Sequence, residues 1–141
     1  MRRVLQVFFT LTLFGSVIFA NDFREVFKIS LKKDEQKKIL VKYDNKEKLF
    51  EFRWTLYVND GLVTLYKYDD FIAQNVLYLN HKNQSLRIKL RDDGQNYYNP
   101  PYFLLKFKDF DVKKQKAKFE LYLYDNAMQM KLKFLKNKKT N

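Results

Sequence analysis

The sequence contains no cysteine, a single histidine and a single tryptophan, and only three glycines and two prolines among its 141 residues. Without cysteine the chain cannot form a disulfide framework, a thiolate zinc site or a cysteine nucleophile. The one histidine, His81, leaves almost nothing from which to build a catalytic triad, a histidine-rich metal site or a proton relay. These absences predict a protein that is not an enzyme and that uses neither a metal nor a cofactor.

The first 20 residues, MRRVLQVFFTLTLFGSVIFA, have the layout of a secretory signal peptide. Arg2 and Arg3 give a basic start, residues 4–14 are mostly apolar, and Ala20 supplies the small residue that a signal peptidase requires at its cleavage point. The pattern predicts export to a periplasm, with a mature chain that begins at Asn21. The uncharged stretch over residues 4–21 is also just long enough to cross a bilayer, so an uncleaved N-terminal membrane anchor is the alternative.

From residue 21 onward apolar and polar side chains alternate, which is the pattern of half-buried β-strands. In residues 49–57 one face of the expected strand holds Phe50, Phe52, Trp54 and Leu56. Tyr57 falls on the opposite face. The same alternation recurs in residues 23–32, 39–43, 62–68, 75–80, 85–90, 102–108, 117–124 and 128–134. We therefore expect a single β domain over residues 21–135, followed by a basic, disordered tail over residues 136–141.

The breaks between these segments carry residues that tolerate the positive φ of tight hairpins. The strongest signal is Asn59-Asp60-Gly61, and weaker ones are Asp44-Asn45, Asp69-Asp70, Asp92-Asp93-Gly94 and Asp125-Asn126. The segment FIAQ, residues 71–74, is compatible with a helical turn. The whole pattern predicts an all-β fold: an antiparallel meander of eight or nine short strands closed as a small barrel or a β-sandwich, because a flat sheet would leave one apolar face in water.

Positive charge dominates the composition, with 28 Lys and Arg against 16 Asp and Glu and a net charge of +12. Such an excess of positive charge suggests that the partner is an anionic glycan, an anionic lipid or an envelope protein. Peripheral contact with a membrane is also compatible with this charge. The competing interpretation is a compositional bias, because most of the basic residues are lysine rather than the arginine that recognises phosphates with its planar fork. Nucleic acid is not an expected partner, since an exported chain rarely meets it.

The longest predicted loop, over residues 91–101, is the first candidate binding site. The candidate residues are Tyr97, Tyr98, Asn99, Pro100, Pro101 and Tyr102. Tyrosines beside prolines offer large, fairly rigid contact surfaces with a hydroxyl group, which suit a protein or a sugar. The alternative is structural, with the same tyrosines closing one open end of the barrel or sandwich.

The second candidate site is a strand face on which tyrosines and lysines are expected to point outward: Tyr57, Tyr122, Tyr124, Lys131 and Lys133. On neighbouring strands these residues would form an aromatic strip among lysines that could stack on sugar rings. Cross-strand pairing that only stabilises the sheet is the competing interpretation. The paired aspartates of the turns are interpreted as solvated carboxylates, because nothing places them across a substrate from each other.

Three functional hypotheses follow. The first is a non-enzymatic, exported β domain that acts by surface binding, as an envelope interaction or scaffold protein with a basic, tyrosine-bearing face. The alternative is a carrier of a lipid or other hydrophobic ligand inside a small β-barrel, with a cavity lined by Phe50, Phe52, Trp54, Phe107, Phe119 and Phe134. The third is a small outer-membrane barrel, which is disfavoured because several expected strands are shorter than the roughly 9–11 residues that cross a bilayer.

Overall fold

The computed structural model describes residues 25–91 and 100–136. The predicted signal peptide, the candidate residues Tyr97, Tyr98 and Asn99, and the end of the predicted tail lie outside these ranges. The described residues form nine strands, in agreement with the sequence pattern: β1 (Glu25–Lys32), β2 (Lys37–Tyr43), β3 (Lys46–Val58), β4 (Gly61–Tyr68), β5 (Phe71–Tyr78), β6 (Ser85–Lys89), β7 (Tyr102–Asp111), β8 (Lys116–Tyr124) and β9 (Lys131–Leu135). In this part of the chain no helix is long and apolar enough to span a membrane.

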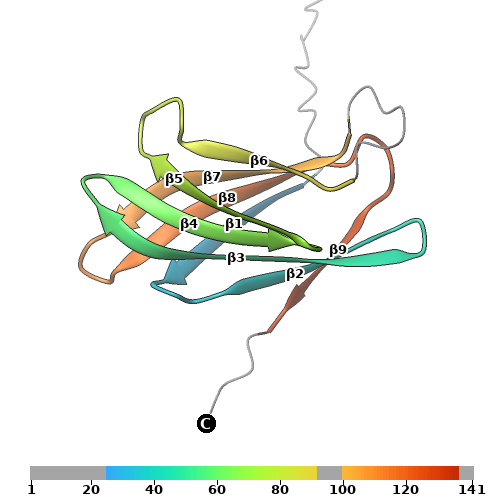
Figure 1. The fold of residues 1–141 in the computed structure, drawn as a ribbon, viewed down its shortest axis with the longest axis horizontal. Helices are drawn as coiled ribbons and strands as arrows, with labels where there is room; N and C mark the ends of the chain where they lie inside the picture. The colour runs from blue at the N-terminus through green and yellow to red at the C-terminus, as the bar shows by residue number, and fades with distance from the viewer. Residues whose placement is uncertain (1–24, 92–99, 137–141) are drawn as a thin grey trace, which may run out of the picture.

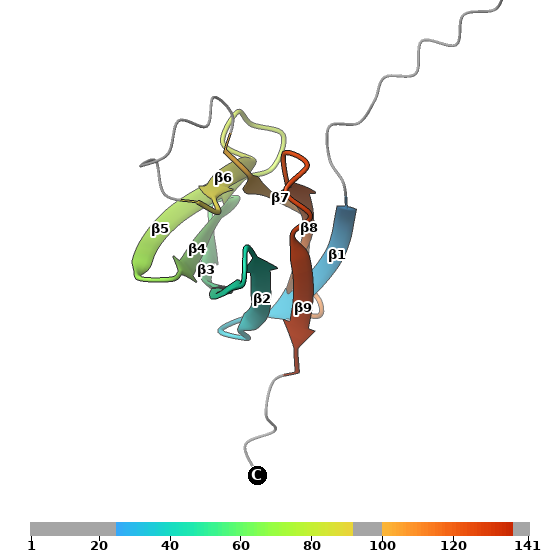
Figure 2. The ribbon, with the colours of Figure 1, turned by 90° about the vertical axis from the view of Figure 1, so that its right-hand side faces the viewer.

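The strands form two antiparallel sheets that pack against each other (Figure 1 and Figure 2). The four-stranded sheet has the order β1-β8-β7-β6, and the five-stranded sheet has the order β5-β4-β3-β2-β9. The sheets do not close into a barrel, so the barrel expectation is wrong. A simple meander is also wrong, because β1 pairs with β8 and β9 pairs with β2. Turn residues mark only pairings between consecutive strands, and these two pairings join strands that are far from consecutive.

Hairpin turns form at three of the predicted Asp and Asn sites, between β2 and β3, between β3 and β4 and between β4 and β5, whereas the turn at Asp125-Asn126 leads from β8 to β9 in the other sheet. Six residues of the predicted turns have φ between 45° and 62°: Asp44, Asn45, Asn59, Asp60, Asp69 and Asn126. Gly61 is different, because it begins β4 and does not have a positive φ. A Cβ atom at Gly61 would lie only 2.9 Å from the ring of Tyr78. The missing side chain there makes room for a neighbouring ring instead of permitting a turn.

The inner faces of both sheets share one apolar core. Its largest fully buried side chains are Trp54, Phe50, Phe52, Phe103, Phe107 and Phe119. Rings from opposite sheets contact each other, since Phe52 meets Phe119 edge to face with centroids 5.5 Å apart. Phe50 lies 5.1 Å from Phe103, with the two rings tilted by 51°, also across the two sheets. Aromatic side chains therefore fill the space between the sheets.

Two hydrogen bonds also link the sheets. The indole nitrogen of Trp54 in β3 donates to the carbonyl oxygen of Leu31 in β1 over 2.8 Å. The hydroxyl group of Tyr68 in β4 donates to the carbonyl oxygen of Leu90, directly after β6, also over 2.8 Å. Both bonds are buried, so each satisfies polar groups that would otherwise cost free energy inside the core.

A bulge in β3 reverses the alternation near the end of that strand. Thr55, between Trp54 and Leu56, is an extra residue relative to β4. Leu56, expected inside, is therefore 50% exposed. Tyr57 instead turns inward and stacks on Phe110 with ring centroids 3.9 Å apart. The predicted outward orientation of Tyr57 is wrong, because one inserted residue moves every later side chain to the opposite face.

The segment FIAQ belongs to β5 and not to a helical turn. The hairpin at Asp69 and Asp70 returns the chain along β4, and Phe71 pairs at once with Tyr68. The ladder with β4 then continues to Tyr78. Residues 71–74 contain no charged side chain and alternate only weakly, so tertiary pairing decides their conformation where the local pattern does not.

Candidate functional site

Residues 100–102, at the end of the predicted binding loop, are buried or half-buried. Pro101 is buried, and its carbonyl oxygen accepts a hydrogen bond from the backbone nitrogen of Leu90 over 2.9 Å. Tyr102 is also buried and stacks on Tyr124 of β8, with ring centroids 5.0 Å apart. Pro100, at the start of this segment, is half-buried. The structure thus brings together Tyr102 and Tyr124, one from each predicted candidate site.

Tyr122 and Tyr124 point to the outer face of the four-stranded sheet, as predicted. Tyr122 donates a hydrogen bond to the Glu120 carboxylate on the same face. This bond raises the pKa of the Tyr122 hydroxyl to about 12, and it lowers the pKa of Glu120. Lys108 adds an ion pair to Glu120 at 3.5 Å. The bond between Tyr122 and Glu120 lies within β8, whereas the ion pair between Lys108 and Glu120 joins β7 to β8.

The five residues of the predicted face do not lie on one surface. Tyr57 points into the core from β3. Lys131 and Lys133 are exposed on β9 at the edge of the five-stranded sheet, whereas Tyr122 and Tyr124 belong to the four-stranded sheet. Alternation within each strand could not show that these strands belong to different sheets.

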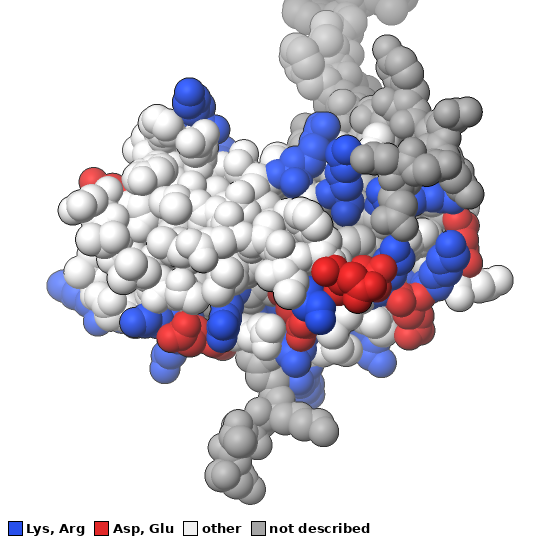
Figure 3. Space-filling model, in the orientation of Figure 1, with Lys and Arg blue, Asp and Glu red and all other residues white. Residues whose placement is uncertain are grey.

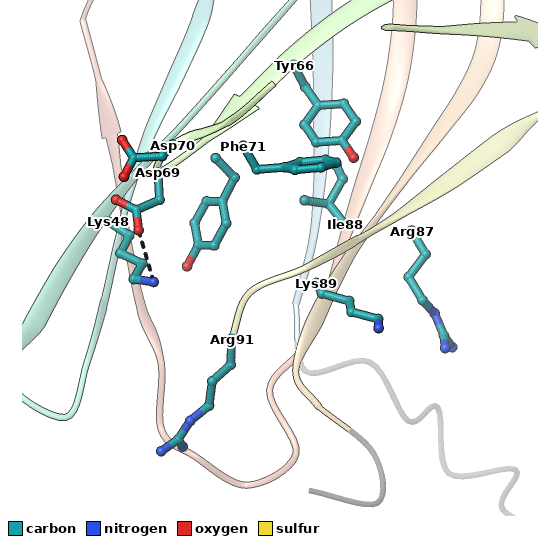
Figure 4. Close-up of a pocket in the computed structure, with 10 residues that line it drawn as sticks. Lys48, Tyr66, Asp69, Asp70, Phe71, Arg87, Ile88, Lys89 and Arg91 are labelled. Carbon is teal, nitrogen blue, oxygen red and sulfur yellow. Dashed lines mark ion pairs between the residues drawn. The ribbon is translucent and has the colours of Figure 1, made fainter. Parts of the chain in front are cut away.

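A cleft of about 720 Å³ opens elsewhere, between the β4–β5 hairpin of one sheet and β6 of the other. We call it the basic cleft. Figure 4 shows the side chains that line it, which come from both sheets. They are Lys48, Tyr66, Tyr68, Asp69, Asp70, Phe71, Arg87, Ile88, Lys89 and Arg91.

Aromatic rings make up the apolar part of the basic cleft. The rings of Tyr66 and Phe71 lie 6.0 Å apart, and Phe71 is 62% exposed. Burial raises the pKa of the Tyr66 hydroxyl above its ordinary value of 10.0. Tyr68 is fixed at the base of the cleft by its hydrogen bond to Leu90. An exposed phenylalanine beside anchored tyrosines provides a preformed apolar contact surface.

Four cationic side chains and two carboxylates surround these rings, so the lining has an excess of positive charge. Lys48 pairs with Asp69 over 3.1 Å, a contact that Figure 4 marks. Arg91 pairs with Asp44 over 3.5 Å. Arg87 lies on the rim, with its guanidinium carbon 3.8 Å from the ring centroid of Tyr102. Ion pairs and ring stacking hold these cations in place beside the cleft.

This arrangement can bind a ligand that joins an anionic group to a ring or an apolar chain. Guanidinium and ammonium groups bind phosphate and carboxylate oxygens through charge-assisted hydrogen bonds. This site was not predicted from the sequence, although the sequence contains one signal of it: Arg87, Lys89 and Arg91 alternate along SLRIKLR. That pattern predicts cations on one side of a strand, but it does not predict which aromatic residues the strand will face.

The groups usually associated with catalysis are dispersed. His81 is exposed in the turn after β5, where its Nδ1 accepts a hydrogen bond from the backbone nitrogen of Asn83 over 3.2 Å. Asp69 and Asp70 are exposed in a hairpin turn, as interpreted from the sequence. In residues 25–91 and 100–136 no three His, Cys, Asp or Glu side chains come together as potential metal ligands.

Comparison of the chain with family models, with curated proteins and with solved structures finds no match. We therefore infer the function from the geometry of the site.

Proposed function

We propose that this protein is a non-enzymatic, exported β domain that binds an anionic ligand of the cell envelope in the basic cleft. The ligand class is a glycan or lipid that carries phosphate or carboxylate groups next to a ring or acyl chain. The observation that carries the proposal is that Arg87, Lys89 and Arg91 line a cleft that also contains the exposed ring of Phe71. This cleft differs from both candidate surfaces selected from the sequence, because none of their named residues lines it.

The lipid-carrier hypothesis finds less support than surface binding does. It assumed that aromatic side chains line a hollow barrel, but Phe50, Phe52 and Trp54 are buried against other rings between two unclosed sheets. The outer-membrane hypothesis assumed a closed barrel as well. A lipid can still meet this protein in the basic cleft, where an acyl chain would contact Phe71 while its headgroup contacts the cations.

Binding can be tested with vesicles and a soluble glycan as separate probes. Phosphatidylglycerol vesicles present the anion on a lipid, heparin presents it on a glycan, and phosphatidylcholine vesicles serve as the uncharged reference. We expect binding to at least one anionic probe and none to phosphatidylcholine. R87Q/K89Q is expected to weaken that binding about tenfold or more, because each lost charge-assisted hydrogen bond is worth about 1.5–3 kcal/mol.

The matched control is K131Q/K133Q, which removes the same charge from the exposed edge strand β9. This pair also tests the two lysines of the originally predicted face. Equal weakening by both double variants would show that net charge alone drives binding, and it would refute the basic cleft as the site. Phe71→Ala should weaken binding to the preferred probe with little effect on folding, since this ring is largely exposed.

A further inference from the structure

The four edge strands of the two sheets differ in charge. An edge strand presents unpaired backbone groups that can pair with another chain, and charged side chains commonly prevent this. Three of the edges carry such charges: β1 has Glu25, Lys28 and Lys32, β6 has Arg87 and Lys89, and β9 has Lys131 and Lys133. The fourth edge, β5, reads FIAQNVLY and has no charged residue. Only β5 therefore lacks this protection among the described edges.

The backbone of β5 offers hydrogen-bonding groups on its open side. The backbone nitrogen of Tyr78 donates to the carbonyl oxygen of Asn83, outside the β4 ladder. Its N–H group thus points away from β4. In an antiparallel pair this direction alternates along the strand, so the N–H and C=O groups of Ile72, Gln74 and Val76 point to the same open side. These three residues can form the ladder with an added strand.

The outer face next to this edge is apolar. Ile72 and Val76 of β5 are 66% and 38% exposed, and Leu56 and Val58 of β3 are each about half exposed. Cross-strand pairing aligns Leu56, Val63 and Val76 in one row across β3, β4 and β5. Figure 3 shows a broad area of one face of the molecule without Lys, Arg, Asp or Glu. Such a surface is typical of a contact site.

The sequence of β5 is self-complementary about Gln74, with Ile72 and Val76 at equal distances from it, which favours a second copy of this chain as the partner. Two copies of a strongly basic chain repel each other wherever lysine-bearing surfaces meet. The uncharged β5 edge and its apolar face avoid that repulsion. An antiparallel strand that pairs with its own copy also generates a closed two-fold interface, in which the same patch is used on both subunits.

We propose that two copies of this protein pair antiparallel through β5, joining their five-stranded sheets into one continuous sheet across a two-fold axis. With the axis at Gln74, Ile72 lies opposite Val76 of the partner subunit, and the two Gln74 side chains meet each other. The register places apolar residues together on the outer face and an amide pair at the centre. This inference does not depend on the ligand of the basic cleft.

The test is the molar mass of the purified protein by sedimentation equilibrium over a range of concentrations. We expect twice the mass of one chain at high concentration. Gln74→Lys should weaken dimerisation about tenfold or more, because it places two lysines opposite each other at the axis. The matched control is Ser30→Lys, which adds the same charge at an exposed position of β1 and should leave dimerisation unchanged.

Amide hydrogen exchange gives a second measurement on the unmodified chain. The amides of Ile72, Gln74 and Val76 should exchange more slowly as protein concentration rises, which also keeps the proposal testable if Gln74→Lys fails to fold. A protein that stays monomeric at high concentration would overturn the proposal. So would open-ended polymers, equal weakening by Ser30→Lys, or exchange at β5 that does not depend on concentration.

Discussion

The sandwich has two sides where edges of its sheets lie near each other, and they are built differently. Between β1 and β9, the rings of Phe27 and Phe134 lie 4.7 Å apart, and the Lys37 ammonium group lies 5.2 Å from the centroid of the Phe134 ring. Between β5 and β6, the basic cleft opens and leaves Phe71 mostly exposed. Between β1 and β9 the side chains contact one another. Between β5 and β6 they are accessible to a ligand.

The hydrogen bonds between the sheets follow the same division. Trp54 donates to Leu31 on the β1 side, and its ring also meets Phe110 edge to face at 5.4 Å. Tyr68 donates to Leu90 at the base of the basic cleft. One side therefore joins the sheets mainly through buried packing, whereas on the other side the hydrogen bond of Tyr68 lies beneath an accessible surface. Packing that stabilises the fold and the proposed binding site thus lie on opposite sides.

The largest expected effect is on the packed side. Trp54→Ala should lower the free energy of unfolding by about 3–5 kcal/mol, because it removes a fully buried aromatic side chain and its hydrogen bond to Leu31. Chemical denaturation measures this change, and the melting temperature should fall with it. A loss under about 1 kcal/mol, the size of a typical mutational effect, would contradict the role given to this side.

A smaller effect is expected for Phe27→Ala, which removes one ring of the pair between β1 and β9. The side chain is half-buried, so we expect a loss of about 2 kcal/mol from lost burial and ring contact together. The neighbouring change Val26→Ala is the control, because Val26 is 51% exposed on the opposite face and should cost at most about 0.5 kcal/mol. Similar losses in both variants would mean that the ring pair does not hold this side together.

On the cleft side Tyr68→Phe keeps the ring and removes only the hydroxyl group. It should cost about 1 kcal/mol, since the carbonyl oxygen of Leu90 loses a buried hydrogen bond. Tyr57→Phe is the matched control, because the Tyr57 hydroxyl bonds only to exposed Asp60 over 3.2 Å and its loss should cost less. Both values come from denaturant titration. If Tyr57→Phe were the more damaging change, the link beneath the cleft would be unimportant.

The smallest effect concerns Tyr122, which lies on the outer face of the four-stranded sheet. The hydrogen bond to Glu120 raises the pKa of Tyr122 to about 12 from an ordinary value of 10.0. The folded state therefore favours the neutral hydroxyl, and the stability this provides is complete below pH 10 and lost as pH rises to 12. The difference in unfolding free energy between the wild type and Tyr122→Phe should shrink over this interval.

Ultraviolet titration of tyrosine ionisation in the wild type and in Tyr122→Phe gives the control. The Tyr122→Phe variant should lack one phenolate that ionises near pH 12, while the titration near pH 10 stays unchanged. Loss of a phenolate that ionises near pH 10 would show that the bond to Glu120 does not form in solution.

Much of the strand layout could be predicted because it depends on neighbouring residues. The alternation around Phe50 and Phe52 and the turn at Asn59-Asp60 are local features, and both predictions are confirmed. The orientation of Tyr57 could not be predicted, since it depends on the extra residue Thr55 in the ladder with β4. The basic cleft was not predicted either, because it joins Phe71 from one sheet to Arg87 from the other.

The amino-acid sequence by itself determined that the chain forms short strands with one apolar face and makes its tight turns at Asp and Asn. These properties are local, because side-chain alternation and positive φ are decided within a few residues. Only the tertiary structure decided that β1 pairs with β8, that β5 remains at an edge, and that β5 and β6 stay apart around a cleft. Such outcomes depend on register and on contacts between strands distant in the chain, which many sequences of the same alternating pattern could arrange differently.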